Sequence, residues 1–233
     1  MPYISFMSRG IIFNIPLIIL LIFLFFISPS IADSQIQFTE QGRFPGGATY
    51  VMAMNGNTLY TATGPLVEIW TVSSKGVLPQ NYMVWFGTGE IKPQKIGEIR
   101  FGDNTVCGLA LEKNTLYVGT GEGLEIFNVT VPKNPQRTGS YSKELIGQIR
   151  IRNGLAYVST DFKETNAQET HKFVILDVHD PKNIFEVGNY AIPVKKGHLE
   201  RFTISGNYAY LPIGYDIKPG YVFIVDISNP SKP

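Results

Sequence analysis

The chain has 233 residues, with 20 Lys and Arg, 19 Asp and Glu and a formal net charge of +1. This length suffices for one large hydrophobic core or two small ones. The balanced charge leaves no basic stripe, which argues against nucleic-acid binding and against attraction to an anionic membrane surface. Cys107 is the single cysteine, so no internal disulfide can form and packing must stabilise the fold. We expect Cys107 to be a small buried hydrophobe, not a reactive thiol.

The N-terminal segment has the pattern of a secretory signal peptide. Arg9 is followed by the unbroken apolar run Leu17–Ile27 and then by small residues up to Ala32. We therefore predict that residues 1–32 are removed on export. The alternative is an uncleaved membrane anchor over residues 11–27, because this stretch comes close to the roughly 17 residues that a spanning helix needs. Only in that case would the protein contact a membrane.

The remaining residues predict short strands, because they are rich in Val, Ile, Thr, Tyr and Phe and punctuated by Gly, Asn and Pro. Four segments align without a gap, and each reads as strand, tight turn and strand ending on a tyrosine. They are Met52–Tyr60, Leu109–Tyr117, Ile149–Tyr157 and Phe202–Tyr210. A third strand follows in each unit, over Val67–Val72, Leu124–Val129, Phe173–Val178 and Val222–Ile227. A fourth strand carrying Gly97, Gly139 or Gly188 closes the first three units.

Four-stranded units that recur along a chain predict an all-β fold, a β-propeller built of antiparallel blades. The blades are predicted at about residues 50–99, 107–141, 149–190 and 200–233. The segment 36–44 reads as a lone fourth strand, which we expect to complete the last blade and close the ring. The alternative is that these four blades are a truncated part of a larger propeller.

The third strands carry a family resemblance. Gly220–Pro233, with its Val-Phe-Ile-Val-Asp core, resembles the signature of LVIVD-repeat β-propellers. Phe173–Pro181 is a second copy, and Leu124–Val129 is a third in which Asn replaces Asp. The resemblance covers nearly all of residues 36–233. It implies a secreted or cell-surface propeller of bacterial or archaeal type, in a family with no single assigned chemistry.

Residues that could suggest a catalytic or metal site have simpler explanations. Asp177 and Asp226 recur at the end of the third strand, with Asn128 at the matching place, and we expect them to accept backbone N–H groups and organise the turn. Single acids spaced around a ring cannot supply the several oxygens that calcium needs. Gly119–Gly123 lacks the third glycine and the helix of a dinucleotide loop. The three histidines are not spaced as zinc ligands are, and the sequence has no Gly-x-Ser-x-Gly turn of the kind that presents a catalytic serine. We predict no enzyme, no metal and no cofactor.

The long loops of neighbouring blades are predicted to share one face. The loop between second and third strands is enlarged in blades three and four, and by chain direction it emerges where the connection entering blade four runs. These segments, residues 159–172, 191–200 and 212–220, are called the rim. Because binding residues concentrate on loops held by a rigid scaffold, the rim is the candidate site, although ordinary solvated loops are the alternative. The candidate ligand-binding residues are Asp161, Glu164, His171, His198, Tyr215 and Asp216.

The sequence therefore predicts a secreted or cell-surface, non-catalytic propeller that binds a protein or a glycan at the rim. Two alternatives are a fragment of a propeller enzyme, hydrolase or quinoprotein-like, whose active site lies in missing blades, and a structural surface-layer component. The apolar insert of blade one, residues 73–92, is expected to form an extra strand or a partner contact on the opposite face.

Overall fold

The structure is a computed structural model that describes residues 3–8, 11–16, 49, 51–73, 92–163, 169–194, 198–199, 201–214 and 220–233. By its contacts the chain divides into two units, Met1–Glu40 and Gln41–Pro233. In the first unit, β1 (Tyr3–Ser8) pairs antiparallel with β2 (Ile11–Pro16). Within the described ranges, no helix has the length and apolarity to cross a membrane. Signal cleavage stays a prediction, and the predicted closing strand at residues 36–44 lies outside the described residues.

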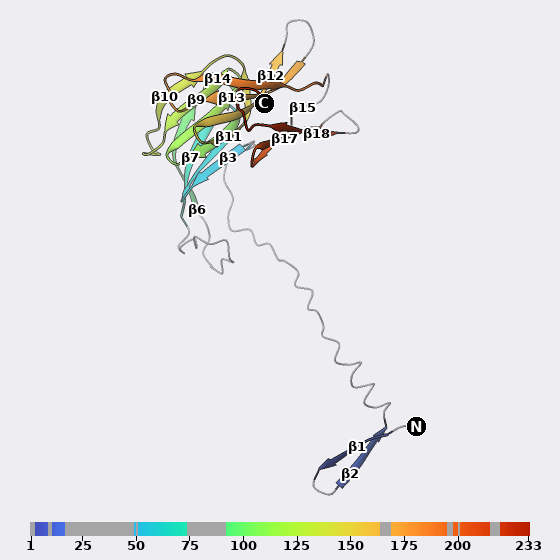
Figure 1. Ribbon diagram of the computed structural model, residues 1–233. Coiled ribbons are helices and arrows are strands. Elements are labelled where there is room, and N and C mark those ends of the chain that lie inside the picture. Colours follow the sequence, from blue (N-terminus) through green and yellow to red (C-terminus); the bar gives the residue numbers. More distant parts are fainter. Residues whose placement is uncertain are drawn as a thin grey trace. The chain divides into compact units, whose positions relative to one another are not determined.

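The second unit consists of four-stranded antiparallel sheets, which confirms the predicted all-β propeller blades (Figure 1). Blade one joins β3 (Val51–Asn55), β4 (Thr58–Thr63), β5 (Leu66–Ser73) and β6 (Lys92–Arg100). Blade two joins β7 (Val106–Glu112), β8 (Thr115–Thr120), β9 (Gly123–Asn128) and β10 (Gln136–Tyr141). Blade three joins β11 (Leu145–Arg152), β12 (Leu155–Lys163), β13 (Glu169–Asp177) and β14 (Phe185–Ala191). Blade four joins β15 (His198–Leu199), β16 (Thr203–Ser205), β17 (Tyr208–Gly214) and β18 (Tyr221–Asp226).

Blade four differs from the other three. Its β17 pairs with both short strands, β15 and β16, on one side and with β18 on the other. Among the described strands, β18 therefore forms an outer edge, and no strand of blade one pairs with a strand of blade four. The insert of blade one lies outside the described residues from position 74 to 91.

The hydrophobic core lies between blades rather than inside one sheet. One cluster joins blades one and two, including Tyr60 and Leu116, and a second joins blades two and three, including Ile126 and Ile149. A third joins blades three and four around Phe173, whose ring packs edge-on against a neighbouring aromatic ring. Blades one, two and three are thus each covered on one face by the next blade, and the buried apolar area between blades stabilises their stacking.

Each pair of neighbouring blades also meets through a glycine of the fourth strand. A Cβ placed on Gly139 would overlap the carbonyl oxygen of Pro181, and one on Gly188 would overlap that of Pro230. At Gly97 the corresponding carbonyl, that of Pro132, would lie 3.3 Å away. A side chain at the first two places would push the next blade outward, so the shared glycine of the fourth strands is a steric requirement of the junction.

The partners of these glycines are tight turns with proline at the second position. Each turn is closed by a backbone bond from its fourth N–H to its first carbonyl, as in Asn183 to Asp180 at 3.0 Å. Equivalent bonds join Asn134 to Val131 at 2.9 Å and Lys232 to Asn229 at 3.0 Å. The turn follows the third strand in every case, so the repeated Pro and the repeated Gly form one recurring contact between successive blades.

Candidate functional site

A cavity of about 490 Å³ lies where the first strands of the blades approach one another. Its walls come from β3, β7 and β11, from the end of β12 and from the residues that enter blade four. Met52, Leu145 and Leu199 supply apolar wall, and polar groups come from a second set of side chains. That set consists of Gln148, Arg150, Ser159 and Arg201. The cavity and the rim share two residues, Ser159 and Leu199.

Two β-bulges shape the wall of this cavity. In β11 the residues Gly147 and Gln148 lie opposite the single residue Ser159, because the register shifts between Ile146 and Ile149. The Gln148 N–H, which the bulge removes from the ladder, donates to the Ser159 hydroxyl at 2.8 Å. A Cβ on Gly147 would lie 2.7 Å from that hydroxyl, so a side chain there would displace the hydroxyl from its bond with Gln148. Bulges commonly re-aim side chains next to functional sites.

The second bulge makes Cys107 the extra residue of β7, between Val106 and Gly108, where the register with β8 shifts. Its thiol is half-buried, lines the cavity and lies 3.5 Å from the Thr105 carbonyl oxygen. The expectation of a buried Cys107 is therefore wrong, because the bulge turns the side chain out of the alternating register that the sequence suggested.

Gln148 fixes the entrance of blade four against β11. Its side-chain Nε2 donates to the Phe202 carbonyl at 3.0 Å, and the Phe202 N–H donates to its Oε1 at 2.5 Å. The amide thus pairs with both backbone groups of one residue, as a neighbouring strand would. Because Phe202 is fully buried, this clamp holds the adjacent Arg201 at the cavity.

Arg150 and Arg201 make the cavity electropositive. Partial burial lowers the pKa of the Arg150 guanidinium, and repulsion by the Arg201 charge lowers that pKa further. Arg150 donates to the Ile149 carbonyl at 3.1 Å. Among the described residues that line the cavity there is no carboxylate. An anionic group that enters this space would offset the repulsion that Arg150 experiences from Arg201.

The structure links the three rim segments at their bases. Asp161 pairs with His171 across the β12–β13 hairpin, which extends to the pair Lys163–Glu169 (Figure 1). The His171 carbonyl accepts the Ile192 N–H at 2.9 Å, which ties the hairpin to the connection leaving blade three. His198 pairs with Gly214, which ties that connection to the loop of blade four.

The predicted binding residues are thus partly brought together. Asp161, His171 and His198 belong to paired strands of the linked rim segments. The His171 residue is only 2% exposed, so it supports the hairpin from within. Glu164, Tyr215 and Asp216 lie outside the described residues. Contact of any of the six with a ligand stays a prediction.

Sequence reasoning missed the two arginines of the cavity. The signal was available in the repeats, because Arg150 occupies the position of Ala53 in blade one, Ala110 in blade two and Thr203 in blade four. A long cation at a place that otherwise holds small side chains marks a local departure from the repeat. The partners of Arg150 could not be inferred, because they depend on the bulge in β11.

The acids at the ends of the third strands are turn caps, as predicted. The Asp177 carboxylate accepts the His179 N–H at 3.0 Å, and that of Asp226 accepts the Ser228 N–H at 2.8 Å. The Asn128 side-chain oxygen does the same for Thr130 at 2.9 Å. In the part of the chain that the structure describes, no group of three or more His, Cys, Asp or Glu side chains is arranged to hold a metal ion.

Comparisons with known proteins agree with this architecture. The family model of the LVIVD repeat matches residues 196–233, which is consistent with the resemblance seen in the last blade. No curated protein sequence matches the chain. Among solved structures, the computationally designed protein Ika4 is 10% identical, with a TM-score of 0.51 over 82% of this chain and 100% of Ika4. This similarity supports the β-propeller fold and nothing about activity.

Two larger solved structures match with lower scores. The computationally designed Ika8 protein is 9% identical, with a TM-score of 0.36 over 82% of this chain and 75% of its own. The N-terminal domain of Nup159 is 10% identical, with a TM-score of 0.35 over 78% of this chain and 59% of its own.

The turn caps give a prediction about acid stability. Hydrogen bonds from backbone N–H groups lower the pKa of Asp177 and of Asp226. A carboxyl whose pKa is lower in the folded state stabilises the fold above its unfolded pKa, about 3.9, and loses that contribution as pH falls through the folded pKa. The variant Asp177→Asn/Asp226→Asn should keep the caps, as Asn128 does, but show a smaller fall of Tm below about pH 4.

Thermal unfolding between pH 2 and 7 tests this, with Asp177→Ala/Asp226→Ala as the matched variant. The alanine variant lacks the caps and should melt lower than the wild type at pH 7, whereas the asparagine variant should not. Equal losses in both variants at pH 7, or a stabilising effect of calcium on the wild type alone, would favour a charge-dependent or metal-binding role.

Proposed function

We propose that this protein is an exported, non-catalytic β-propeller module that binds a partner on the face shared by the rim and the central cavity. The observation that carries the proposal is the cavity with two arginines at the bases of three linked loop segments. Propeller blades hold such segments rigidly, so ordering them on binding costs little conformational entropy.

The chemistry of the cavity favours a partner with an anionic group. Arg150 and Arg201 point positive charge at a space large enough for a side chain or a sugar, and Met52, Leu145 and Leu199 offer apolar contact beside it. Arginine suits carboxylate and sulfate because its donors match two oxygens at once. An acidic protein segment and an acidic glycan both meet this description.

Removal of the cavity charges is the first test. Poly-glutamate and polygalacturonate serve as the acidic peptide and acidic glycan probes, and their binding is measured by calorimetry at two salt concentrations. We expect at least one to bind with an affinity that falls with salt, and Arg150→Gln/Arg201→Gln to weaken it by about tenfold or more.

The matched control is Lys133→Gln/Lys182→Gln, which removes two charges from the exposed turns after the third strands of blades two and three. These turns lie at the opposite ends of the strands, so binding of the probe should be unchanged. The proposed site is wrong if both variants lose binding equally, or if the wild type binds neither probe.

Export forms the second part of the proposal. It rests on the N-terminal pattern and on the resemblance to a secreted or cell-surface family. Expression of the full chain in a secreting bacterial host should release a protein whose N-terminus begins at Asp33, as read by mass spectrometry. A product that stays membrane-bound with residues 1–32 intact would instead identify the apolar segment as an anchor, and an unprocessed product inside the cell would contradict export.

A further inference from the structure

The three junctions between blades bury the same positions each time. The face that a blade turns toward its successor, here called the trailing face, carries apolar side chains of the third strand. At its first position stand Val67, Leu124 and Phe173, each 0% exposed. Two residues later stand Ile69, Ile126 and Ile175, which are also 0% exposed. The next blade covers these side chains in blades one, two and three.

Blade four has the same apolar positions without a cover. Val222 is 62% exposed and Ile224 is 64% exposed, although they align with the fully buried residues of the other third strands. Tyr221 and Tyr208 are exposed beside them. A strand with one solvated face normally alternates apolar and polar residues, but β18 is apolar on both faces, as are strands covered on both sides. The trailing face of blade four therefore has the apolar composition of the faces that are buried between blades.

Blade one has the complementary surface. The opposite face of a blade, here called the leading face, begins with the first apolar residue of the first strand. At this position Leu109, Ile149 and Phe202 are buried against the preceding blade, whereas Met52 is 63% exposed. Met54, two residues on, is exposed as well. On the second and third strands of the same face, Leu59, Trp70 and Val72 form a small buried cluster. Met52 and Met54 are the exposed apolar residues beside this cluster.

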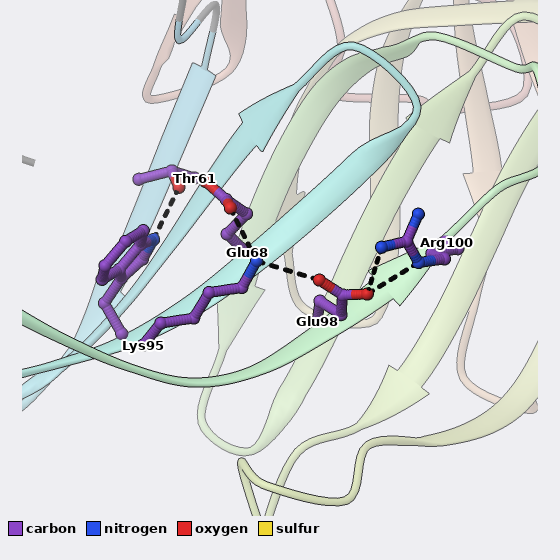
Figure 2. Close-up of polar contacts among 6 residues, drawn as sticks. Thr61, Glu68, Lys95, Glu98 and Arg100 are labelled. Carbon is purple, nitrogen blue, oxygen red and sulfur yellow. Dashed lines mark hydrogen bonds and ion pairs between the residues drawn. The ribbon is translucent and has the colours of Figure 1, made fainter. Parts of the chain in front are cut away.

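The polar contacts of this leading face also match a junction. Lys95 forms ion pairs with Glu68 at 2.7 Å and with Glu98 at 2.9 Å, and Glu98 pairs with Arg100 at 2.6 Å (Figure 2). In blade two the same register positions as Glu68 and Lys95 hold an ion pair between Glu125 and Arg137.

The pair of blade two lines the space between blades one and two together with Arg100 and Phe101. The Lys95–Glu68 ion pair of blade one therefore occupies a position that, in blade two, faces a preceding blade.

We propose that the trailing face of blade four docks on the leading face of blade one in a second copy of this chain. In the isolated chain Val222 and Ile224 of the trailing face and Met52 and Met54 of the leading face are exposed, so these parts of blades four and one do not cover each other. A leading face is what covers a trailing face at all three internal junctions, and blade one holds the described leading face that lacks a preceding blade. Two copies joined head to tail would repeat this contact twice around a two-fold axis and leave neither face uncovered.

The test measures the oligomeric state of the purified chain by sedimentation equilibrium. The wild type should be a dimer. Val222→Lys/Ile224→Lys and Met52→Lys/Met54→Lys should each weaken dimerisation by about 100-fold or more, since lysines would be buried unpaired in both contacts. Because all four side chains are exposed in the isolated chain, the variants should keep the wild-type circular dichroism. The control Phe185→Lys changes an exposed aromatic residue outside both faces and should leave the dimer intact.

Mixing the two lysine variants separates head-to-tail docking from other arrangements. In a mixed pair, one contact joins two unaltered faces, so dimers should partly reappear. A monomeric wild type would overturn the proposal. If the backbone amide of Val222 were then protected from hydrogen exchange, the chain's own blade one would close the ring. Dimers that survive either lysine variant, or no recovery on mixing, would also overturn it. Val222 and Ile224 do not line the cavity, so Val222→Lys/Ile224→Lys should lose dimerisation and still bind the cavity probe, and the two proposals can fail separately.

Discussion

The close backbone contact between a fourth-strand glycine and the proline turn of the next blade is the constraint on which the arrangement of blades depends. It recurs at Gly97, Gly139 and Gly188, each time against a turn closed by its own hydrogen bond. A β-bulge directly before each glycine makes the contact possible. Ile96, Thr138 and Val187 are the extra residues, and each bends the fourth strand toward the next blade. The glycine contact sets the distance between neighbouring sheets, and the apolar side chains fill the space between them.

The two ends of the strands differ in how their connecting segments are built. The tight turns between first and second strands and the capped turns after the third strands belong to one end of the strands, and the glycines contact these capped turns. At the other end the segments lengthen in blades three and four, and the first strands meet at the cavity. The Gln148 clamp on Phe202 shows how the scaffold fixes this end as well. Arg150 lies in β11, and Arg201 lies between β15 and β16 directly before the clamped Phe202, which favours a preorganised charge pair.

The sequence predicted the features that depend on residues close together in the chain, namely the turns and their caps. Turn positions followed from Asn and Gly, and Asn153 and Gly206 do adopt positive φ there, 52° and 55°. The caps at Asp177 and Asp226 followed from the same local chemistry. The bulges could not be predicted, because an extra residue in one strand is visible only against its partner. For that reason β11 begins at Leu145, earlier than the predicted Ile149, and Cys107 faces the cavity. The cavity itself depends on strands of all four blades, which are far apart in sequence.

Substitution of the junction glycines by alanine tests the central constraint most directly, with the free energy of unfolding measured in urea. Gly139→Ala and Gly188→Ala should each lose about 2–4 kcal/mol, since the methyl group would overlap a backbone carbonyl that cannot move without its blade. Gly97→Ala should lose clearly less, because its nearest carbonyl lies 3.3 Å from the position that the methyl group would take, and Gly121→Ala, with nothing within 4 Å, should lose little or nothing. Equal effects at all four positions, or the largest loss at Gly121, would contradict the account.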